Sequence, residues 1–144
     1  MLAGLVSVEK IELAAALTQR FGQEGKTVTV IDDLRRMPAD DARFDGAARV
    51  RLSGDLRESL LPGLAEITSD VALLLVSETA WPDDLFTLLD EARQRIPALD
   101  VYSLALIDTR TCDCFPEFRV TLEAYADEVV SLPAAWEDVV EGVV

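Results

Sequence analysis

The longest uninterrupted aliphatic run in the chain, residues 71–76, constrains the fold more than any other feature. Because no polar residue interrupts it, this run predicts a strand that is covered on both faces, as strands of parallel sheets are. Residues 26–31 and 101–107 are further strand candidates, and segments with helical spacing of apolar residues separate the three. We therefore predict a single doubly wound α/β domain over residues 1–144, with a mostly parallel sheet of about five or six strands and helices on both faces.

The rest of the chain fits the same alternation of strands and helices. Further strand candidates are residues 1–7, 49–52 and 128–132, and helices are predicted over residues 8–21, 56–67, 82–96, 118–126 and from Pro133 onward. Ser7 is the expected N-cap of the first helix. Residues 32–47 contain two Asp-Asp pairs, a proline and a glycine, and are predicted to form a loop with at most a short helix.

Acidic residues dominate the charge of the chain. The sequence has 27 Asp and Glu against 13 basic residues, of which 11 are Arg and only two are Lys, and its formal net charge is −14. It lacks the basic surface that nucleic acids and anionic membranes require, so neither is an expected partner. An acidic surface with few lysines resembles proteins adapted to high salt, and an ordinary acidic cytosolic protein is the alternative.

Other function classes are excluded by what the sequence lacks. It contains no histidine, so a Ser-His-Asp or Cys-His triad within the chain is excluded. The aliphatic run of residues 71–76 is far shorter than the roughly 18 to 20 residues that span a bilayer. Glu9 follows the apolar N-terminal residues at once, and no basic segment precedes them, so a secretory signal is not expected. We expect a cytoplasmic protein that does not enter membranes.

In a doubly wound sheet, ligands bind at the carboxyl ends of the strands. The segments that follow the predicted strands are residues 7–10, 32–33, 53–55, 77–81 and 108–114. Four carboxylates are expected at this edge and could together hold a divalent cation: Asp32, Asp33, Glu78 and Asp108. A solvated acidic surface is the simpler interpretation, and we predict no metal site and no cofactor.

The N-terminal sequence AGLVSVEKIELAAALTQRFGQEGKTVTVID resembles the opening of P-loop NTPases, particularly the MinD/ParA-type (SIMIBI) ATPases. Gly4 precedes Lys10 at the predicted helix start, and a small-residue helix and a second strand follow. The stretches GDLRESLLPGLAEITSDVALLLVSE and AYADEVVSLP resemble later parts of the same family, so the resemblance covers most of the chain. It implies a P-loop fold and, if a nucleotide is bound, contacts from Gly4, Lys10 and Asp32.

The sequence departs from that family at the phosphate loop. A working P-loop wraps phosphate with glycine amides, and needs a lysine for the β- and γ-phosphates and a hydroxyl for Mg²⁺. Here Glu9 stands at the second glycine, Ile11 replaces the Ser or Thr, and Arg51 occupies the position expected for the Walker B aspartate. The segment between Gly4 and Lys10 is also rich in branched side chains, which resist the wrapping.

These departures predict a non-catalytic regulatory or scaffold protein that acts through protein contacts. A divergent ATPase or GTPase that uses Lys10 and Asp32 is the alternative. The partner is expected to be a protein, and the P-loop resemblance implies that a homodimer is one candidate, since that family works as dimers.

A second resemblance is to response-regulator receiver domains. It rests on VTVIDD from Val28, on Asp70 before an aliphatic strand, and on the stretches EARQRIP and YADEVVSLPAAWEDVVEGV. Asp32 and Asp33 would correspond to the acidic pair that holds Mg²⁺ in receivers. The phospho-acceptor aspartate would fall at Leu75 and the lysine at Leu132, so this resemblance implies at most a pseudo-receiver. A receiver would also have no extra strand and helix built from residues 1–25.

Two further pairs of residues are candidates for function. Cys112 and Cys114 are the only cysteines, and with no histidine one chain cannot supply the four ligands of a structural zinc site. They remain candidates for a metal shared by a dimer or for a redox pair. Trp81 and Trp136 are candidate partner-binding residues, because exposed tryptophans concentrate binding energy, although packed anchors are equally compatible with the sequence.

Overall fold

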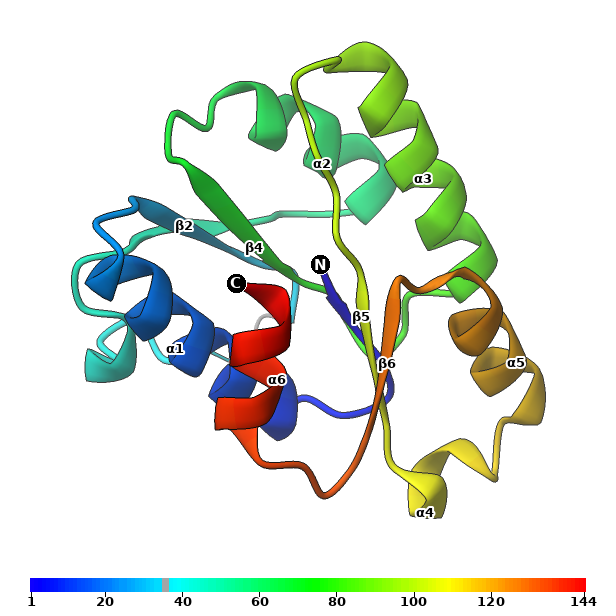
Figure 1. Ribbon diagram of the computed structural model, residues 1–144. Coiled ribbons are helices and arrows are strands. Elements are labelled where there is room, and N and C mark those ends of the chain that lie inside the picture. The colour runs from blue at the N-terminus through cyan, green and yellow to red at the C-terminus, as the bar shows by residue number, and fades with distance from the viewer. Residues whose placement is uncertain (35–36) are drawn as a thin grey trace.

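Six parallel strands form one sheet in the computed structural model, which describes residues 1–34 and 37–144, the side chain of Cys112 excepted (Figure 1). The strand order is β3-β2-β4-β1-β5-β6, and all neighbouring pairs are parallel. The strands are β1 (Leu2–Ala3), β2 (Val28–Asp32), β3 (Ala48–Arg51), β4 (Val71–Leu75), β5 (Leu104–Ile107) and β6 (Glu128–Ser131). This architecture confirms the predicted α/β fold with a parallel sheet.

The first strand is short but lies in the middle of the sheet. Leu2 pairs with Leu75 of β4 on one side and with Leu104 of β5 on the other. Leu2 is 1% exposed, because β1 is covered by helices on both faces and by a strand on each side. The loop that follows β1 therefore emerges at the centre of the carboxyl edge, between the loops that follow β4 and β5.

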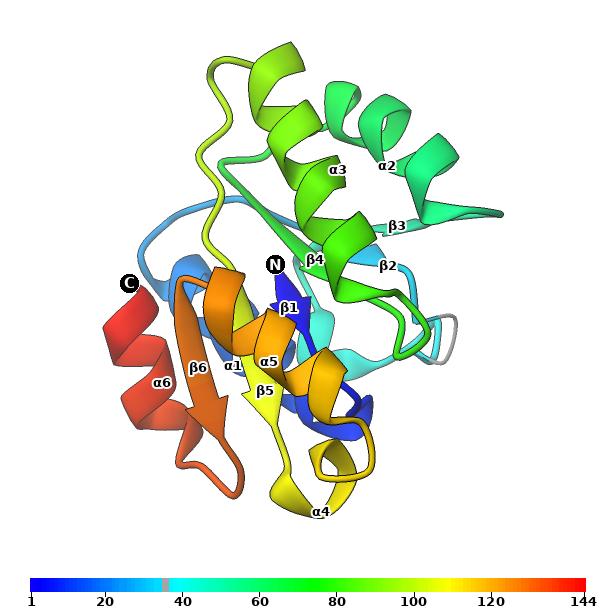
Figure 2. The ribbon, with the colours of Figure 1, turned by 90° about the vertical axis from the view of Figure 1, so that its right-hand side faces the viewer.

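Helices cover both faces of the sheet, as predicted. They are α1 (Val8–Gln23), the short 3₁₀ helix η1 (Ala42–Phe44), α2 (Leu56–Ala65), α3 (Pro82–Arg95), α4 (Thr109–Cys112), α5 (Pro116–Tyr125) and α6 (Trp136–Val143). One layer consists of α1 and α6, which lie side by side in Figure 1, and the other consists of α2, α3 and α5, which stand in front of the sheet in Figure 2.

Each layer encloses its own hydrophobic core. On the α1 and α6 side, Leu13, Leu17 and Val140 pack against inward side chains of the strands. On the other side, Leu60 of α2, Leu88 of α3 and Leu122 of α5 meet the opposite face of the same strands. Two covering layers account for the unbroken aliphatic character of the central strands, because both faces of β1, β2, β4 and β5 are largely covered, whereas the edge strands β3 and β6 are partly exposed.

Local structure differs from the sequence prediction mainly at helix ends. The last helix begins at Trp136 and not at Pro133, which lies in the connection after β6. The segment after β5 was expected to be a loop, yet residues 109–112 form the short helix α4, whose N-cap Asp108 accepts a hydrogen bond from the backbone N–H of Arg110. In the described part of the chain, no helix combines the length and apolarity needed to cross a bilayer.

Candidate functional site

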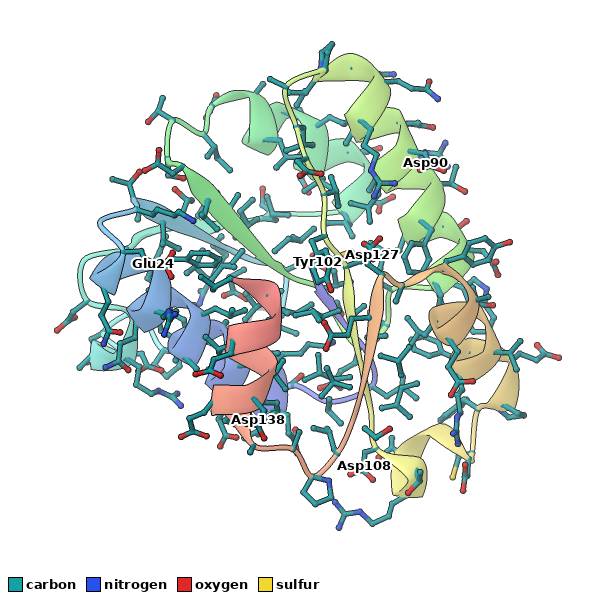
Figure 3. All side chains as sticks on the ribbon, viewed as in Figure 1. Glu24, Asp90, Tyr102, Asp108, Asp127 and Asp138 are labelled. Atoms are coloured by element: carbon teal, nitrogen blue, oxygen red, sulfur yellow. The ribbon has the colours of Figure 1, made fainter. Side chains whose placement is uncertain are left out.

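The carboxyl ends of the strands bring together most of the residues that the sequence singled out. The β1–α1 connection, residues 4–7, lies between the segment after β4 and the segment after β5, where Figure 3 labels Asp108 beside α4. Asp32 is the last residue of β2, the next strand beyond β4, and Asp33 follows it. Because all strands are parallel, these residues share one edge of the sheet, as predicted.

Gly4 is required by the packing of the sheet. It has a φ of +130°, and a Cβ atom at this position would lie 2.3 Å from the carbonyl oxygen of Leu106 in β5. No other residue fits there without moving the backbone. The glycine that resembles the start of a P-loop is thus explained by the close contact between the first loop and β5.

Lys10 is fully buried in the first turns of α1. Its side chain is 0% exposed, and its Nζ donates a 2.7 Å hydrogen bond to the carbonyl oxygen of Val76, just past β4. Burial lowers the pKa of Lys10 from 10.5 to about 8, although the carboxylates of Glu78 and Asp33 act in the opposite direction. The ammonium group is therefore directed into the protein and held by the segment after β4.

The carboxylates around Lys10 are themselves held by the backbone and by α1. An Oδ of Asp33 accepts a 2.9 Å hydrogen bond from the backbone N–H of Ser77. The hydroxyl of Ser7 donates to Glu78, so this side chain does not cap α1 as the sequence suggested. One lysine, two carboxylates and a hydroxyl thus link the loops after β1, β2 and β4. Such a linked set of partners rigidifies the edge of the sheet.

The carboxylate of Asp32 lies near Arg51, the residue that ends the neighbouring strand β3. An Oδ of Asp32 is 3.5 Å from Nε of Arg51, and that arginine also donates to the carbonyl oxygen of Met37. The carboxylates that act on the pKa of Lys10 are those of Glu78 and Asp33. The sequence indicates Lys10 and Asp32 as candidate nucleotide contacts, and that stays a prediction; the aspartate that acts on the pKa of Lys10 in the structure is Asp33.

The strand expected to carry the Walker B position lies at the edge of the sheet. Arg51 belongs to β3, which β2 and β4 separate from β1. The strand beside β1 is β4, so its following residues, and not position 51, face the β1–α1 loop. The acidic residue in contact with that loop is Glu78, through Ser7. The Walker B comparison at Arg51 stays a prediction, and in the structure the residues after β4, not Arg51, lie beside the β1–α1 loop.

Ile11 contributes to the hydrophobic core. It is 9% exposed and packs in the layer between α1 and the sheet. At the position where a P-loop has a hydroxyl for Mg²⁺, this chain places a hydrocarbon side chain among other hydrocarbons. Throughout residues 1–34 and 37–144, no buried side-chain nitrogen or oxygen lacks a hydrogen-bond partner. Ile11 itself offers no group that could bind a metal ion.

A cavity of about 250 Å³ opens next to the start of α1. Glu9 and Glu12 line it from α1, together with Asp108, Arg110 and Trp136. Arg110 binds Asp108 through two hydrogen bonds, of 3.1 and 2.7 Å, which lower the pKa of that carboxyl group. Three carboxylates against one paired arginine make this cavity unsuited to an anionic ligand.

Cys112 and Cys114 lie in the segment after β5, where the sequence placed a candidate metal or redox pair. Cys114 is exposed with a free thiol, and the side chain of Cys112 lies outside the described residues. Among the residues that the structure describes, no three acids, histidines or cysteines are grouped so that they could hold a metal ion. The metal and redox roles of the cysteine pair remain predictions.

The two tryptophans differ in their surroundings. Trp136 packs against the core under α6, and its indole N–H lies 3.3 Å from an Oε of Glu12. Trp81 precedes α3, is 47% exposed, and packs edge-on against Phe118 of α5 with ring centroids 5.9 Å apart. Trp136 therefore has the environment of an anchor in the core, whereas Trp81 offers half of its surface to solvent.

Comparisons with known proteins support the fold and go no further. No family model and no curated protein matches the chain. The chain is similar to the signal recognition particle receptor FtsY from Elizabethkingia anophelis, with a TM-score of 0.60 and 17% identity over 91% of this chain and 48% of that one. The structure of FtsY in complex with GDP gives a TM-score of 0.59 and 16% identity over 91% and 47% of the two chains.

These neighbours define the class as an α/β fold of the P-loop NTPase type. The chain spans about half the length of the FtsY structures that it matches. The narrower resemblance to MinD/ParA-type ATPases stays a prediction. The receiver resemblance does not account for the strand order, because β1 lies between β4 and β5, where a receiver with the order 2-1-3-4-5 would have no additional strand.

Proposed function

We propose that this chain is a non-catalytic regulatory or scaffold protein, built on a P-loop-type fold, that acts through contacts with other proteins. The observation that carries the proposal is the burial of Lys10, whose ammonium group is fully enclosed and bonded to the carbonyl oxygen of Val76. A P-loop lysine must reach the β- and γ-phosphates. In this chain, the same residue serves instead to join α1 to the segment after β4.

The backbone of the first loop supports the same proposal. Phosphate is held by several successive N–H groups in a glycine-rich loop. Here α1 already begins at Val8, and the only glycine before it is Gly4, where the carbonyl of Leu106 occupies the nearby space. The branched side chains of Leu5 and Val6 follow it. This loop offers little open backbone for a phosphate group.

Electrostatics add a second obstacle. Glu9 lies in the first turn of α1, and Glu78 accepts a hydrogen bond from Ser7 at the start of the same helix. A di- or triphosphate at this helix terminus would meet carboxylates within a few ångströms, at a cost of about 1 kcal/mol or more for each close pair of like charges. These carboxylates oppose the attraction that a helix N-terminus otherwise exerts on anions.

A thermal unfolding experiment tests this proposal. A nucleotide that binds only the folded state, at about 100 times its dissociation constant, adds about 2.7 kcal/mol of stability. For a domain of this size that raises the midpoint by several degrees. We expect no shift with Mg-GTP or Mg-ATP, at low or high salt, and no release of phosphate. A shift that Lys10→Met abolishes and Lys26→Met preserves would overturn the proposal, because Lys26 is the exposed lysine of the same chain.

A divergent GTPase or ATPase is the second candidate function. The observation that favours it is the similarity to FtsY, one structure of which contains GDP. In that case Lys10 would have to leave its bond to Val76 when nucleotide binds, and phosphate release would depend on Lys10. The same unfolding and phosphate-release measurements separate the two candidates.

A further inference from the structure

Two aromatic pairs join α5 to α3 and to the residue that precedes α3. Trp81 packs against Phe118 at 5.9 Å, and Phe86 packs against Tyr125 at 5.7 Å between ring centroids. We call these four residues the aromatic seam. Two of its rings remain largely open to solvent, because Trp81 is 47% and Tyr125 is 64% exposed. Phe115, which immediately precedes α5, is 55% exposed as well.

A cavity of about 370 Å³ adjoins the seam at Trp81. Its apolar lining comes from Leu56 of α2 and from Leu85 and Leu88 of α3, and carboxylates are supplied by Asp55 and Asp84. Arg57 also lines it, but its guanidinium group is 3.4 Å from Glu91, which offsets its charge. A cavity with an aliphatic floor and two carboxylates suits a long side chain that ends in a positive charge.

Acidic residues predominate around the seam. Residues 81–92 and 113–125 include seven acidic residues and one basic residue, Arg119. That arginine is already shared by Asp113, at 3.1 Å, and Glu123, at 2.9 Å. Within residues 81–92 and 113–125, all of which the structure describes, no positive charge is therefore without an acidic partner.

We infer that the aromatic seam and its adjoining cavity bind a basic amphipathic helix of a partner protein. Apolar side chains of that helix would cover Trp81 and Tyr125, and one of its Lys or Arg side chains would enter the cavity toward Asp84. The inference rests on the proposed function, since it identifies the surface through which the protein contacts would be made.

The negative charge of the chain favours a basic helix over two other candidates that could cover the aromatic seam, a second copy of the chain and an anionic membrane. A second copy would bring the same acidic rim against this one, and each chain carries a formal net charge of −14. An anionic membrane surface would repel it in the same way. A helix that carries Lys and Arg beside its apolar face is attracted by the acidic residues around the seam, whereas a second copy or an anionic membrane is repelled by them.

Trp81 itself can report the binding. In the variant Trp136→Phe, Trp81 is the only tryptophan, and its emission responds to removal from water. The probe is a synthetic helix of about 18 residues, made of leucine and lysine with leucines on one face. A scrambled peptide of identical composition, and hence identical charge, has no apolar face and serves as the control probe.

We expect a saturable blue shift of Trp81 emission with the amphipathic peptide, and at least tenfold weaker binding of the scrambled one. Asp84→Lys with Glu117→Lys should weaken binding of the amphipathic peptide at least tenfold, and should lower the thermal midpoint by only a few degrees, because both side chains are exposed but lie in the first turns of their helices. Glu137→Lys with Glu141→Lys changes the net charge equally on α6, in the opposite layer, and should weaken it much less (Figure 1).

Four results would overturn the inference: no shift of Trp81 emission, equal binding of both peptides, equal weakening by the two double variants, or burial of Trp81 by self-association or by phosphatidylglycerol vesicles. Sedimentation at increasing concentration detects the self-association. Nucleotide binding is measured without peptide, so failure of the proposed function and failure of this inference give different results.

Discussion

Lys10 of α1 and Val76 after β4 are joined by a 2.7 Å hydrogen bond from the ammonium group to the carbonyl oxygen. The lysine is fully enclosed, so this bond forms away from water, beside the carboxylates of Glu78 and Asp33. A buried ammonium group costs several kcal/mol in desolvation, which its hydrogen bond and the carboxylates offset. The stability of the folded chain must therefore depend on the protonation of Lys10.

The first prediction concerns that dependence on pH. Burial lowers the pKa of Lys10 from 10.5 to about 8, so between these values the unfolded chain binds more protons than the folded one. The free energy of unfolding of the wild type should therefore rise with pH across this window, by up to about 3 kcal/mol relative to Lys10→Met. Urea unfolding of both proteins at several pH values measures this difference.

Lys26→Met is the matched control for this prediction. Lys26 is exposed and lies over the ring of Phe21, so removing it should leave the rise with pH intact. Below pH 8, Lys10 is protonated in both states, and the difference between wild type and Lys10→Met should stay flat. A rise that persists in Lys10→Met would assign the effect to another group.

The second prediction concerns Gly4. An alanine Cβ there would lie 2.3 Å from the carbonyl oxygen of Leu106, at a φ of +130° that L-residues rarely adopt. Gly4→Ala should cost about 3 kcal/mol or more, because either the backbone of the first loop or β5 must move. Chemical denaturation measures the loss.

Gly22→Ala is the internal comparison for Gly4→Ala. Gly22 lies in α1, and nothing approaches within 4 Å of a Cβ atom built there. Alanine is the better helix former, so this variant should gain up to about 1 kcal/mol. Equal effects of the two substitutions would show that Gly4 has no special packing role.

Much of the fold could be predicted from the sequence, because the strands are continuous apolar runs and their spacing leaves room for helices. All the strand candidates became strands of the sheet, and the short first strand was found from residues 1–7. The order of the strands could not be read in this way. In the structure, β4 lies beside β1, and β3 with Arg51 lies at the edge of the sheet. The pairing of strands depends on contacts between residues far apart in sequence, which local sequence patterns do not contain.

The burial of Lys10 was missed, although the sequence carried a signal for it. Lys10, Ala14, Leu17 and Phe21 follow helical spacing, and all four are buried in the structure. Position 10 thus extends the apolar stripe of α1 by one turn. A charged residue was assigned to solvent or to phosphate, because burial of a lysine requires a specific acceptor, and the carbonyl of Val76 is distant in sequence.

The third prediction concerns Asp70, which links the starts of β2 and β4. One oxygen of its carboxylate accepts hydrogen bonds from the backbone N–H and the hydroxyl of Thr27, at 2.8 and 2.7 Å. These bonds lower the pKa of Asp70, so its contribution is present at neutral pH and is lost as the pH falls below about 4. Asp70→Asn should lower the thermal midpoint at pH 7, and this loss should become smaller as the pH falls below about 4 toward pH 3.

Asp100→Asn serves as the comparison for Asp70, since Asp100 is an exposed aspartate in the connection before β5. It should leave the midpoint nearly unchanged at both pH values. If Asp70→Asn lowers the midpoint equally at pH 7 and pH 3, the effect does not come from the ionised carboxylate.

The fourth prediction concerns an attempt to rebuild the phosphate loop. Glu9→Gly with Ile11→Thr restores the glycine and the hydroxyl that a P-loop requires. Ile11 is 9% exposed in the core, so its replacement should cost about 1 to 3 kcal/mol. We still expect no rise of the thermal midpoint with Mg-GTP, because Lys10 remains bonded to Val76 and Glu78 remains at the start of α1. Ile11→Val, which keeps the core apolar, controls for the lost volume. A rise in the double variant that Ile11→Val lacks would mean that the phosphate site was blocked by positions 9 and 11, and not by the burial of Lys10.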